Sequence, residues 1–147
     1  MIKIEDMTPA EMKSLPGAKD FGHLGCARNG RPYVVPMHYI YDGEFIYFLT
    51  TEGTKTEYLK SNNEVCFQVE EIIDRENWQS VMVTGRAEYI TDPEEKEHTI
   101  QKIAARNPTV TPAISLTVVD AWSRQTTVAI YRIQTEMIDG RKTTEKI

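Results

Sequence analysis

Residues 22–50 read GHLGCARNGRPYVVPMHYIYDGEFIYFLT, a stretch in which two turn dipeptides separate three apolar segments. Asn29-Gly30 divides the first segment from the second, and Asp42-Gly43 divides the second from the third. Both dipeptides are strong signals for two-residue hairpin turns, because Asn, Asp and Gly tolerate the positive φ angles that such turns need. We therefore predict an antiparallel meander of three strands over residues 22–28, 31–41 and 44–50.

The middle strand of this meander is apolar on both of its alternating faces. One face carries apolar or tyrosine side chains at every odd position from 33 to 41, and the other carries Val34, Pro36, His38 and Ile40. An antiparallel strand with one face in water would instead alternate apolar with polar residues. We therefore expect its outer face to be covered, either by a helix or by a second subunit.

Pro36 interrupts this apolar strand. Proline has no N–H group to donate to a β-ladder, so it belongs at a sheet edge or a bulge, where neighbouring backbone groups stay unpaired. Two interpretations remain open. Either a ligand with its own donors and acceptors meets those backbone groups, or the segment is a simple edge strand.

Three capping motifs predict short helices on either side of this stretch. They read TPAE at residues 8–11, TKTE at 54–57 and DPEE at 92–95. In such motifs a hydroxyl or carboxylate at the N-cap and a Glu three residues later satisfy free N–H groups of the first turn. The first predicted helix ends near Pro16, the second runs from Thr54 to about Ser61, and the third ends near Arg106.

Three further segments have the composition of strands, at residues 65–71, 78–90 and 126–138. Gly85 lies inside the long second segment and predicts a bulge or a close backbone approach. With the meander, these segments make six strands. Six strands flanked by small helices predict a mainly β fold, a closed or partly closed antiparallel β-barrel.

Length and composition predict one globular domain. The chain has 147 residues, of which 27% are charged and 40% hydrophobic, and its net charge of -5 provides no basic surface for nucleic acid or an anionic membrane. No apolar run approaches the roughly 20 residues of a membrane span, and the N-terminus has no signal-peptide pattern. We expect a single domain over residues 1–147 in the cytoplasm, with Cys26 and Cys66 as reduced core thiols.

Motifs for protein-borne catalysis are absent from the sequence. His23, His38 and His98 have no mutual spacing that suits a metal ion, so we predict no metal site. The chain also lacks a nucleophile elbow, a Walker loop and a Rossmann glycine motif. An enzyme without a nucleophile, metal or acid–base pair of its own must obtain its chemistry from a cofactor.

Lys55 falls in the first turn of the predicted helix 54–61, where the positive end of the helix dipole disfavours a cation. Lys55 either points into water at a small energetic cost, or it meets an anion at the same place. Exposed N–H groups, threonine hydroxyls and an ammonium group together bind phosphate well. The residues alone leave both interpretations open.

Five segments follow one another in a recognisable order: GHLG, NGRPYVVPMHYIYDG, EFIYFLTTEGTKTEYLKSN, EVCFQVEE and WQSVMVTGRAEYITDPEEK. In this order the chain resembles the FMN-binding split-barrel family related to pyridoxamine 5'-phosphate oxidase, especially its short members similar to 5-nitroimidazole resistance proteins. The resemblance spans residues 20–105, with a weaker match in TVAIYRIQTEMIDGRK. It implies a six-stranded split β-barrel that forms a homodimer, with FMN in a groove between the two subunits.

The resemblance also implies which residues hold the cofactor. The segment Pro36-Met37-His38-Tyr39 would lie against the isoalloxazine ring, with backbone groups near Val35 and Met37 at its polar edge. The residues that would bind the phosphate are Thr50, Thr51, Thr54 and Lys55. Gln79 and Ser80 would approach the flavin, in many family members from the partner chain. Trp78 and Trp122 either stack on the ring or, as we favour, lie in the core or the subunit interface.

The implied function is that of an FMN-dependent oxidoreductase that passes electrons from a reduced nicotinamide to a small aromatic or quinone-like acceptor. One alternative is a module of the same fold that binds flavin, haem or deazaflavin without turnover. Another is a cofactor-free dimeric interaction protein. We do not expect pyridoxamine phosphate oxidation itself, because the final residues, GRKTTEKI, lack the arginine and histidine pair of those enzymes. Leu49 stands where nitroimidazole-type members commonly carry a histidine.

Overall fold

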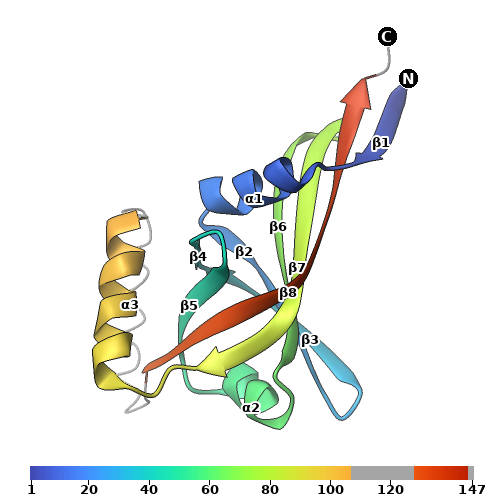
Figure 1. Ribbon diagram of the computed structural model, residues 1–147. Coiled ribbons are helices and arrows are strands. Elements are labelled where there is room, and N and C mark those ends of the chain that lie inside the picture. Colours follow the sequence, from blue (N-terminus) through green and yellow to red (C-terminus); the bar gives the residue numbers. More distant parts are fainter. Residues whose placement is uncertain (107–127, 146–147) are drawn as a thin grey trace.

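One antiparallel sheet forms the body of the protein in the computed structural model, which describes residues 1–106 and 128–145 (Figure 1). Its strands are β1 (Ile2–Asp6), β2 (Phe21–Arg28), β3 (Arg31–His38), β4 (Ile40–Tyr41), β5 (Phe45–Thr51), β6 (Glu64–Asp74), β7 (Asn77–Tyr89) and β8 (Val128–Glu145). The described residues also form the helices α1 (Pro9–Ala18), α2 (Thr54–Ser61) and α3 (Pro93–Arg106). The predicted mainly β fold with small flanking helices is confirmed.

The sheet has eight strands, whereas the sequence predicted six. One additional strand is β1, which pairs with the last residues of β8, from Arg141 to Glu145. Its residues, IKIED, alternate apolar and charged side chains over a very short length, so the sequence signal was weak. The other additional strand arises because the predicted strand 31–41 is divided into β3 and β4.

The chain changes its pairing partner at Tyr39. On one side of this residue β3 pairs with β2, and on the other side β4 pairs with β5. The backbone N–H of Tyr39 donates to the carbonyl of Asp20 at 3.1 Å, and its buried hydroxyl donates to the carbonyl of Pro16 at 2.6 Å. These two bonds fix the crossing point, and the predicted meander of three adjacent strands is therefore wrong.

This change of partner closes the sheet into a split barrel. The strand order is β3-β2-β6-β7-β8-β5-β4, so β3 and β4 lie at its two ends. Because Tyr39 joins β3 to β4, the two ends of the sheet lie close together and β3 approaches β5. In the described residues no backbone ladder connects β3 to β5. The opening between β3 and β5 is the split.

Both predicted hairpin turns are present. Asn29 and Gly30 have φ angles of 52° and 75° and connect β2 to β3. In the second turn, the Asp42 carboxylate accepts hydrogen bonds from the N–H groups of Glu44 and Phe45, while Gly43 has a φ of 96°. The turn chemistry was therefore predicted correctly, although the second turn joins a strand of only two residues to β5.

The barrel interior is filled by the inward faces of the strands. Among the described residues, the largest fully buried side chains in this cluster include Tyr39, Phe48, Phe67, Leu24 and Ile46. The Phe48 and Tyr131 rings stack with centroids 5.3 Å apart. The odd-numbered residues from Tyr33 to Tyr41 all belong to or pack on this cluster, which confirms that this face of the segment is buried.

Gly85 lies where β7 and β8 approach most closely. A Cβ atom added at this position would lie 1.9 Å from the carbonyl oxygen of Gln134, and the β7–β8 register shifts between Thr84 and Gly85. The predicted bulge and close backbone approach are both confirmed. Only glycine fits here without moving β8.

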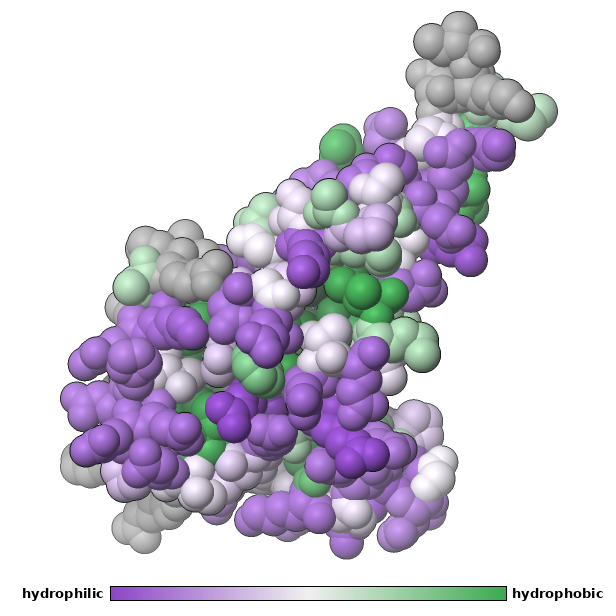
Figure 2. Space-filling model, in the orientation of Figure 1, coloured by the Kyte–Doolittle hydropathy of each residue, from purple (hydrophilic) through white to green (hydrophobic). Residues whose placement is uncertain are grey.

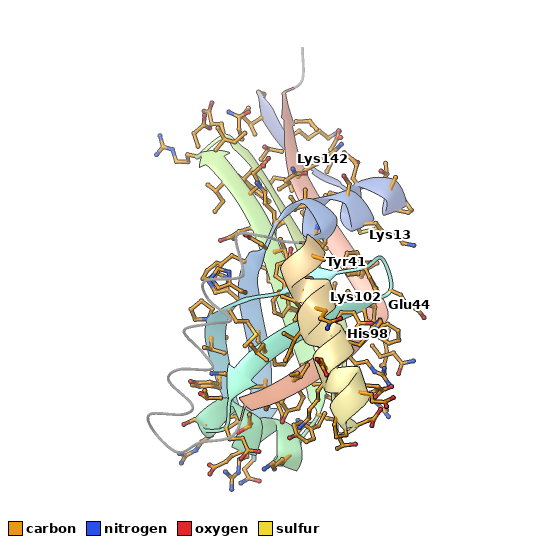
Figure 3. All side chains as sticks on the ribbon, turned by 90° about the vertical axis from the view of Figure 1, so that its left-hand side faces the viewer. Lys13, Tyr41, Glu44, His98, Lys102 and Lys142 are labelled. Carbon is orange, nitrogen blue, oxygen red and sulfur yellow. The ribbon has the colours of Figure 1, made fainter. Side chains whose placement is uncertain are left out.

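Among the described helices, α3 covers one side of the outer face of the barrel. Helix α3 packs on β5 and β8, where Ile100 and Ile103 meet a small cluster that includes Tyr47 and Ile130. Figure 3 shows Lys102 and His98 on α3 beside the hairpin that carries Tyr41 and Glu44. Ile40 belongs to this covered cluster, so the helix accounts for one end of the segment that the sequence predicted to be covered.

The opposite outer face, over β2, β3, β6 and β7, is not covered by any described helix. Val34 is 66% exposed, and Phe21 and Met82 are also exposed. Figure 2 shows that the face seen in Figure 1 is mainly hydrophilic over α3 and carries hydrophobic side chains near its centre. No helix in the described part of the chain has the length and apolar character needed to span a membrane.

Helix α1 begins as predicted. The Thr8 hydroxyl accepts from the N–H of Glu11 at 3.2 Å, and the Glu11 carboxylate accepts from the N–H of Thr8 at 2.9 Å. Pro16 does not end the helix, which continues to Ala18, because a single missing N–H removes one bond and leaves the following turn intact. Helix α3 has the predicted extent, from Pro93 to Arg106.

Candidate functional site

The outer edge of β3 forms one wall of the split. Val35 and Met37 point into the barrel core, whereas Pro36 and His38 lie on the outer face. Pro36 is opposite His23 of β2, and within residues 1–106 and 128–145 no strand pairs with the other edge of β3. Of the two predicted positions for Pro36, a sheet edge or a bulge, the structure has the sheet edge. A ladder could not be completed there, because proline has no N–H to donate.

The start of α2 lies at the end of β5 and differs from the prediction in its cap. Gly53, rather than Thr54, is the N-cap residue, and the first helical bond runs from the N–H of Glu57 to the carbonyl of Gly53 at 3.0 Å. The Thr56 hydroxyl accepts from the N–H of Gly53 at 2.8 Å. The predicted pairing of Thr54 with Glu57 is therefore wrong by one residue, since a glycine cap supplies no side-chain signal.

Lys55 occupies the first turn of α2, as predicted. Its side chain is half-buried, and burial lowers the pKa of its ammonium group below the usual value of 10.5. Several other lysines have carboxylate partners; Lys60, for example, pairs with Glu52, and Lys102 pairs with Asp42. Among the described residues no hydrogen bond or ion pair is found for Lys55. A half-buried ammonium at a helix N-terminus is thus left without a counter-charge.

The three predicted threonines surround this turn in different ways. Thr50 is buried on the inward face of β5, and its hydroxyl donates to the carbonyl of Thr51 at 3.3 Å. Thr51 is half-buried at the end of the strand, while Thr54 is exposed at the first position of the helix. Thr51 and Thr54 therefore offer groups at the surface, whereas Thr50 is turned into the barrel.

Helix α2 packs mainly on β2, and an aromatic contact also joins it to β3. The ring of Tyr58 lies 5.3 Å from the ring of Tyr33. Lys55 precedes Tyr58 by three residues and so projects from the same side of the helix. The Tyr33–Tyr58 contact therefore links α2, which follows β5 along the chain, to β3 on the other side of the split. Sequence reasoning missed the Tyr33–Tyr58 contact, which only the crossing of the chain at Tyr39 creates.

Gln79 and Ser80 lie elsewhere in the chain. The Ser80 hydroxyl accepts from the Gln68 amide at 2.8 Å, and the Gln79 amide donates to Glu71 at 3.2 Å. Glu71 lies seven residues after Glu64, the first residue of β6, which follows α2. Seven residues of a strand span about 20 Å. In one chain these two residues therefore do not join the α2 site, as the opposite positions of α2 and the β6–β7 turn show in Figure 1.

His38 carries a buried polar atom without a partner. Its Nδ1 is inaccessible to solvent and makes no hydrogen bond, and the Phe21 ring stands edge-on to the imidazole at 5.1 Å. Trp78 is half-buried at the start of β7, far from α2, and its backbone N–H donates to the Thr143 hydroxyl at 3.0 Å. Trp122 lies outside the described residues.

The described residues contain no group of three His, Cys, Asp or Glu side chains arranged to hold a metal ion. Cys26 is buried and Cys66 half-buried, and both are free thiols. Burial raises the pKa of Cys26, so this thiol is protonated and unreactive at neutral pH.

Comparisons with known proteins agree with this architecture. The family model described as pyridoxamine 5'-phosphate oxidase matches residues 8–142. A curated relative, the uncharacterized protein RA0666 of Rhizobium meliloti, is 35% identical over 80 residues, which cover 54% of this chain and 53% of the relative. The matched part of the chain thus spans about half the length of that relative.

Solved structures share the fold over nearly the whole chain. A FAD-binding protein from Mesorhizobium loti is 27% identical with a TM-score of 0.81, covering 99% of this chain and 100% of its own. A putative 5-nitroimidazole antibiotic resistance protein from Bacteroides thetaiotaomicron is 22% identical with a TM-score of 0.74, covering 99% of this chain and 93% of its own. The predicted split-barrel architecture is confirmed.

Proposed function

The chain belongs to the pyridoxamine 5'-phosphate oxidase family, and from this premise we propose that it is a flavoprotein that binds FMN in the split between β3 and β5. A flavin has two parts that this site must accommodate, a dianionic phosphate and a planar ring with polar edges. The two halves of the candidate site offer matching chemistry. The start of α2 presents cationic and N–H groups, and the edge of β3 presents unpaired backbone groups beside an apolar surface.

The observation that carries the proposal is the unpaired, half-buried ammonium of Lys55. Its desolvation is unfavourable in the free protein, and a phosphate group would remove that cost by supplying the missing counter-charge. The free N–H groups of the first turn of α2 also favour an anion at this place, and Thr51 and Thr54 add hydroxyl groups. Charge-assisted hydrogen bonds of this kind contribute about 1.5–3 kcal/mol each.

FAD is the second candidate for the cofactor. The Mesorhizobium loti protein is described as FAD-binding, and FAD carries the same ribityl phosphate as FMN. Lys55 would serve both cofactors in the same way, because it would contact the phosphate that they share. Extraction of the purified protein, followed by chromatography and mass determination of the released pigment, separates FMN from FAD.

We also propose a homodimer with the flavin at its interface. The exposed apolar side chains Phe21, Val34 and Met82 lie over the strands beside the split, and a second subunit would remove them from water. The separation of Gln79 and Ser80 from α2 supports the same arrangement. These two residues are too far from α2 of their own chain, so in a dimer they would approach the flavin bound by the other subunit. Sedimentation velocity of the flavin-loaded protein measures the assembly directly.

The proposed reaction is electron transfer from a reduced nicotinamide to a small aromatic or quinone-like acceptor. Bound flavin would supply the redox chemistry. The chain's own residues bind and orient the flavin. Lys55 fixes its phosphate, the β3 edge fixes its ring, and Pro36 and His38 line the adjacent face. A flavin module without turnover is the alternative.

Anaerobic spectroscopy tests the reaction. The proposal predicts that a reduced nicotinamide bleaches the flavin absorbance and that a quinone restores it. A flavin that stays oxidised over hours, although photoreduction can bleach it, would favour the non-catalytic module. A colourless protein that takes up no added FMN or FAD would remove the proposed function altogether.

A further inference from the structure

His38 carries a side-chain nitrogen, Nδ1, that is both shut off from solvent and without a hydrogen-bond partner. Among the side-chain nitrogen and oxygen atoms of the described residues, no other atom combines these two properties. Native proteins leave few buried polar atoms unpaired, because each one loses its hydration without compensation. A ligand cannot supply the missing partner, since it cannot reach a buried atom. The arrangement therefore has to be understood from the other nitrogen of the ring, Nε2.

The imidazole ring of His38 is held in place by the fold around it. His38 is the last residue of β3, and at the next residue the N–H of Tyr39 donates to the carbonyl of Asp20 at 3.1 Å. Phe21 is the neighbour of His38 on β2, and the centroids of their rings lie 5.1 Å apart at an angle of 73°. The fixed backbone and the Phe21 ring thus restrict the rotation of a side chain that is already half-buried.

The burial of Nδ1 decides which nitrogen of the neutral ring carries the hydrogen. A hydrogen on Nδ1 would be a donor without an acceptor in a place that water does not reach, and buried N–H groups without partners are rarer than unpaired acceptors. The hydrogen therefore lies on Nε2. Nε2 forms no hydrogen bond with the described residues and is not one of their buried unpaired atoms, so it is open to solvent. His38 thus presents one free N–H group on the outer face of β3.

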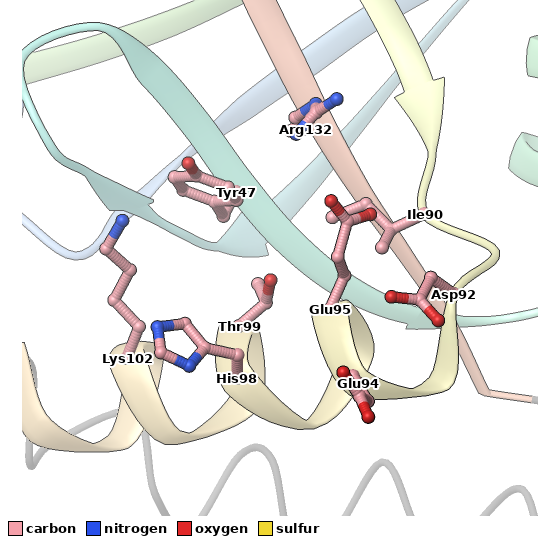
Figure 4. A pocket seen from close by; sticks show the side chains of 9 residues that line it. All are labelled: Tyr47, Ile90, Asp92, Glu94, Glu95, His98, Thr99, Lys102 and Arg132. Carbon is pink, nitrogen blue, oxygen red and sulfur yellow. The ribbon is translucent and has the colours of Figure 1, made fainter.

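The other two histidines lack this arrangement. His23 is half-buried on β2, and its ring lies 6.3 Å from the Phe21 ring. His98 is exposed on α3, where it lines a hollow beside Lys102 (Figure 4). Neither ring has a buried nitrogen without a partner, so burial does not select one tautomer in them. They are matched controls for His38.

The free N–H group of His38 lies next to the strand edge that we propose for the flavin ring. Pro36 and His38 are two residues apart on β3 and therefore share its outer face. An electron acceptor has to contact the flavin ring, so it would lie against this face. Pro36 and Phe21 make the surroundings of the N–H group apolar, and no ion pair of His38 is found among the described residues. Such a surface suits a planar apolar molecule with a carbonyl oxygen.

We propose that His38 determines the acceptor specificity of the flavin site, and that its Nε2–H group donates a hydrogen bond to a carbonyl oxygen of the electron acceptor. This role rests on the proposed function, whose acceptor it narrows to quinone-like molecules. His38 is a hydrogen-bond donor here and not an acid, because a neutral ring that lost its hydrogen would become an imidazolate. The electrons come from the reduced cofactor, and the protons that the quinone gains come from that cofactor and from water.

Reoxidation of the photoreduced protein under anaerobic conditions tests this role with two acceptors. The probe is menadione, a quinone, and the reference is ferrocenium, a cation that has no hydrogen-bond acceptor. His38→Leu should lower the rate constant with menadione about five- to tenfold, the effect of one lost hydrogen bond, and change the ferrocenium rate less than about twofold. The ratio of the two rates removes any effect of the substitution on the flavin itself.

Two amide variants locate the donor atom. A glutamine side chain places its N–H group where Nε2 lies, whereas asparagine reaches only the position of Nδ1. His38→Gln should therefore keep the menadione rate within about threefold of the native rate, and His38→Asn should behave like His38→Leu. The controls His23→Leu and His98→Leu should leave the ratio of the two rates unchanged.

Nitrogen NMR of the native protein with isotope-labelled histidine tests the tautomer without a variant or an acceptor. We expect one imidazole whose hydrogen lies on Nε2, and we expect its signals to be absent from His38→Gln. This measurement also covers the case in which His38→Leu does not fold.

Four results would each contradict the role of His38 while leaving flavin binding intact. They are a hydrogen on Nδ1, an unchanged menadione rate in His38→Leu, an equal fall of both rates in that variant, and an equal loss in His38→Leu and His38→Gln. A native protein that takes up no flavin would instead overturn the proposed function, and the role of His38 would fall with it. The flavin absorbance of the native protein distinguishes these two kinds of failure.

Discussion

Two lysines at opposite ends of the barrel show how stabilising charges differ from binding charges. Lys142 of β8, which is labelled in Figure 3, pairs with Glu11 of α1 at 2.6 Å, and Glu11 also closes the cap of α1 on Thr8. Lys55 of α2 is half-buried and has no partner within the described residues. The Lys142–Glu11 pair at the α1 end is used by the fold, whereas the α2 end retains a half-buried charge for which the described residues supply no partner. We interpret the unused charge as the binding site.

Reversing the charge of Lys55 gives the largest expected effect. In Lys55→Glu a repulsive carboxylate replaces the proposed phosphate contact, so flavin affinity should fall by roughly two orders of magnitude or more. Fluorescence titration of the flavin-free protein with FMN measures this loss. The control is Lys60→Glu, in the last turn of the same helix, which should change affinity less than about threefold. Equal affinities of Lys55→Glu and the native protein would show that the phosphate lies elsewhere.

Substitution of Gly85 tests a position that packing alone determines, where β7 and β8 approach closely. A Cβ at Gly85 would overlap the Gln134 carbonyl at 1.9 Å, so Gly85→Ala should lower the free energy of unfolding by about 3 kcal/mol or more. Denaturant unfolding measures this change. Gly17→Ala is the matched control, because its Cβ meets nothing within 4 Å in α1, and it should be neutral or slightly stabilising. A tolerated Gly85→Ala would contradict the close approach of β7 and β8.

Acid sensitivity distinguishes the α1 end from the α2 end. The hydrogen bond from Lys142 and the cap at Thr8 lower the pKa of Glu11 from 4.5 to about 2. A carboxyl whose folded pKa lies below its unfolded value contributes stability above the unfolded pKa, and this contribution is lost as the pH falls toward the folded value. Glu11→Gln should therefore destabilise the protein at neutral pH and have little effect near pH 2. Thermal unfolding across this window measures it, and a pH-independent difference would rule out the linkage.

The smallest expected effect concerns Lys55 in the absence of flavin. Burial lowers the pKa of Lys55, so folding disfavours its charged form, and the cost is present at neutral pH and disappears as the pH rises toward 10.5. Lys55→Met should therefore raise the melting temperature of the flavin-free protein slightly, by about 1 °C. The same change should lower the melting temperature when FMN is in excess. A destabilised flavin-free variant would mean that the fold does use this charge.

Local signals in the sequence predicted most of the elements, because each depends on a few neighbouring residues. The Asn29-Gly30 and Asp42-Gly43 turns, the Thr8 cap and the bulge at Gly85 all follow from such chemistry. The division of residues 31–41 at Tyr39 could not be predicted in this way. It depends on bonds to Asp20 and Pro16, which are distant in sequence and approach only after the barrel has closed.

The candidate site was predictable to the extent that it is built from one continuous segment. Lys55 conflicts with the helix dipole, and Pro36 cannot complete a ladder, so both were identifiable as exceptions to local rules. The α2–β3 contact through Tyr58 and Tyr33 was not identifiable, since it joins two segments across the split.

The most direct test of the account compares FMN with riboflavin, which has the same ring and lacks the phosphate. If the Lys55 ammonium holds the phosphate, the native protein should bind FMN at least about tenfold more tightly than riboflavin. In Lys55→Met this preference should largely disappear, while riboflavin affinity stays the same. An unchanged preference for FMN over riboflavin in Lys55→Met would contradict the central claim that the unpaired charge of α2 is the phosphate site.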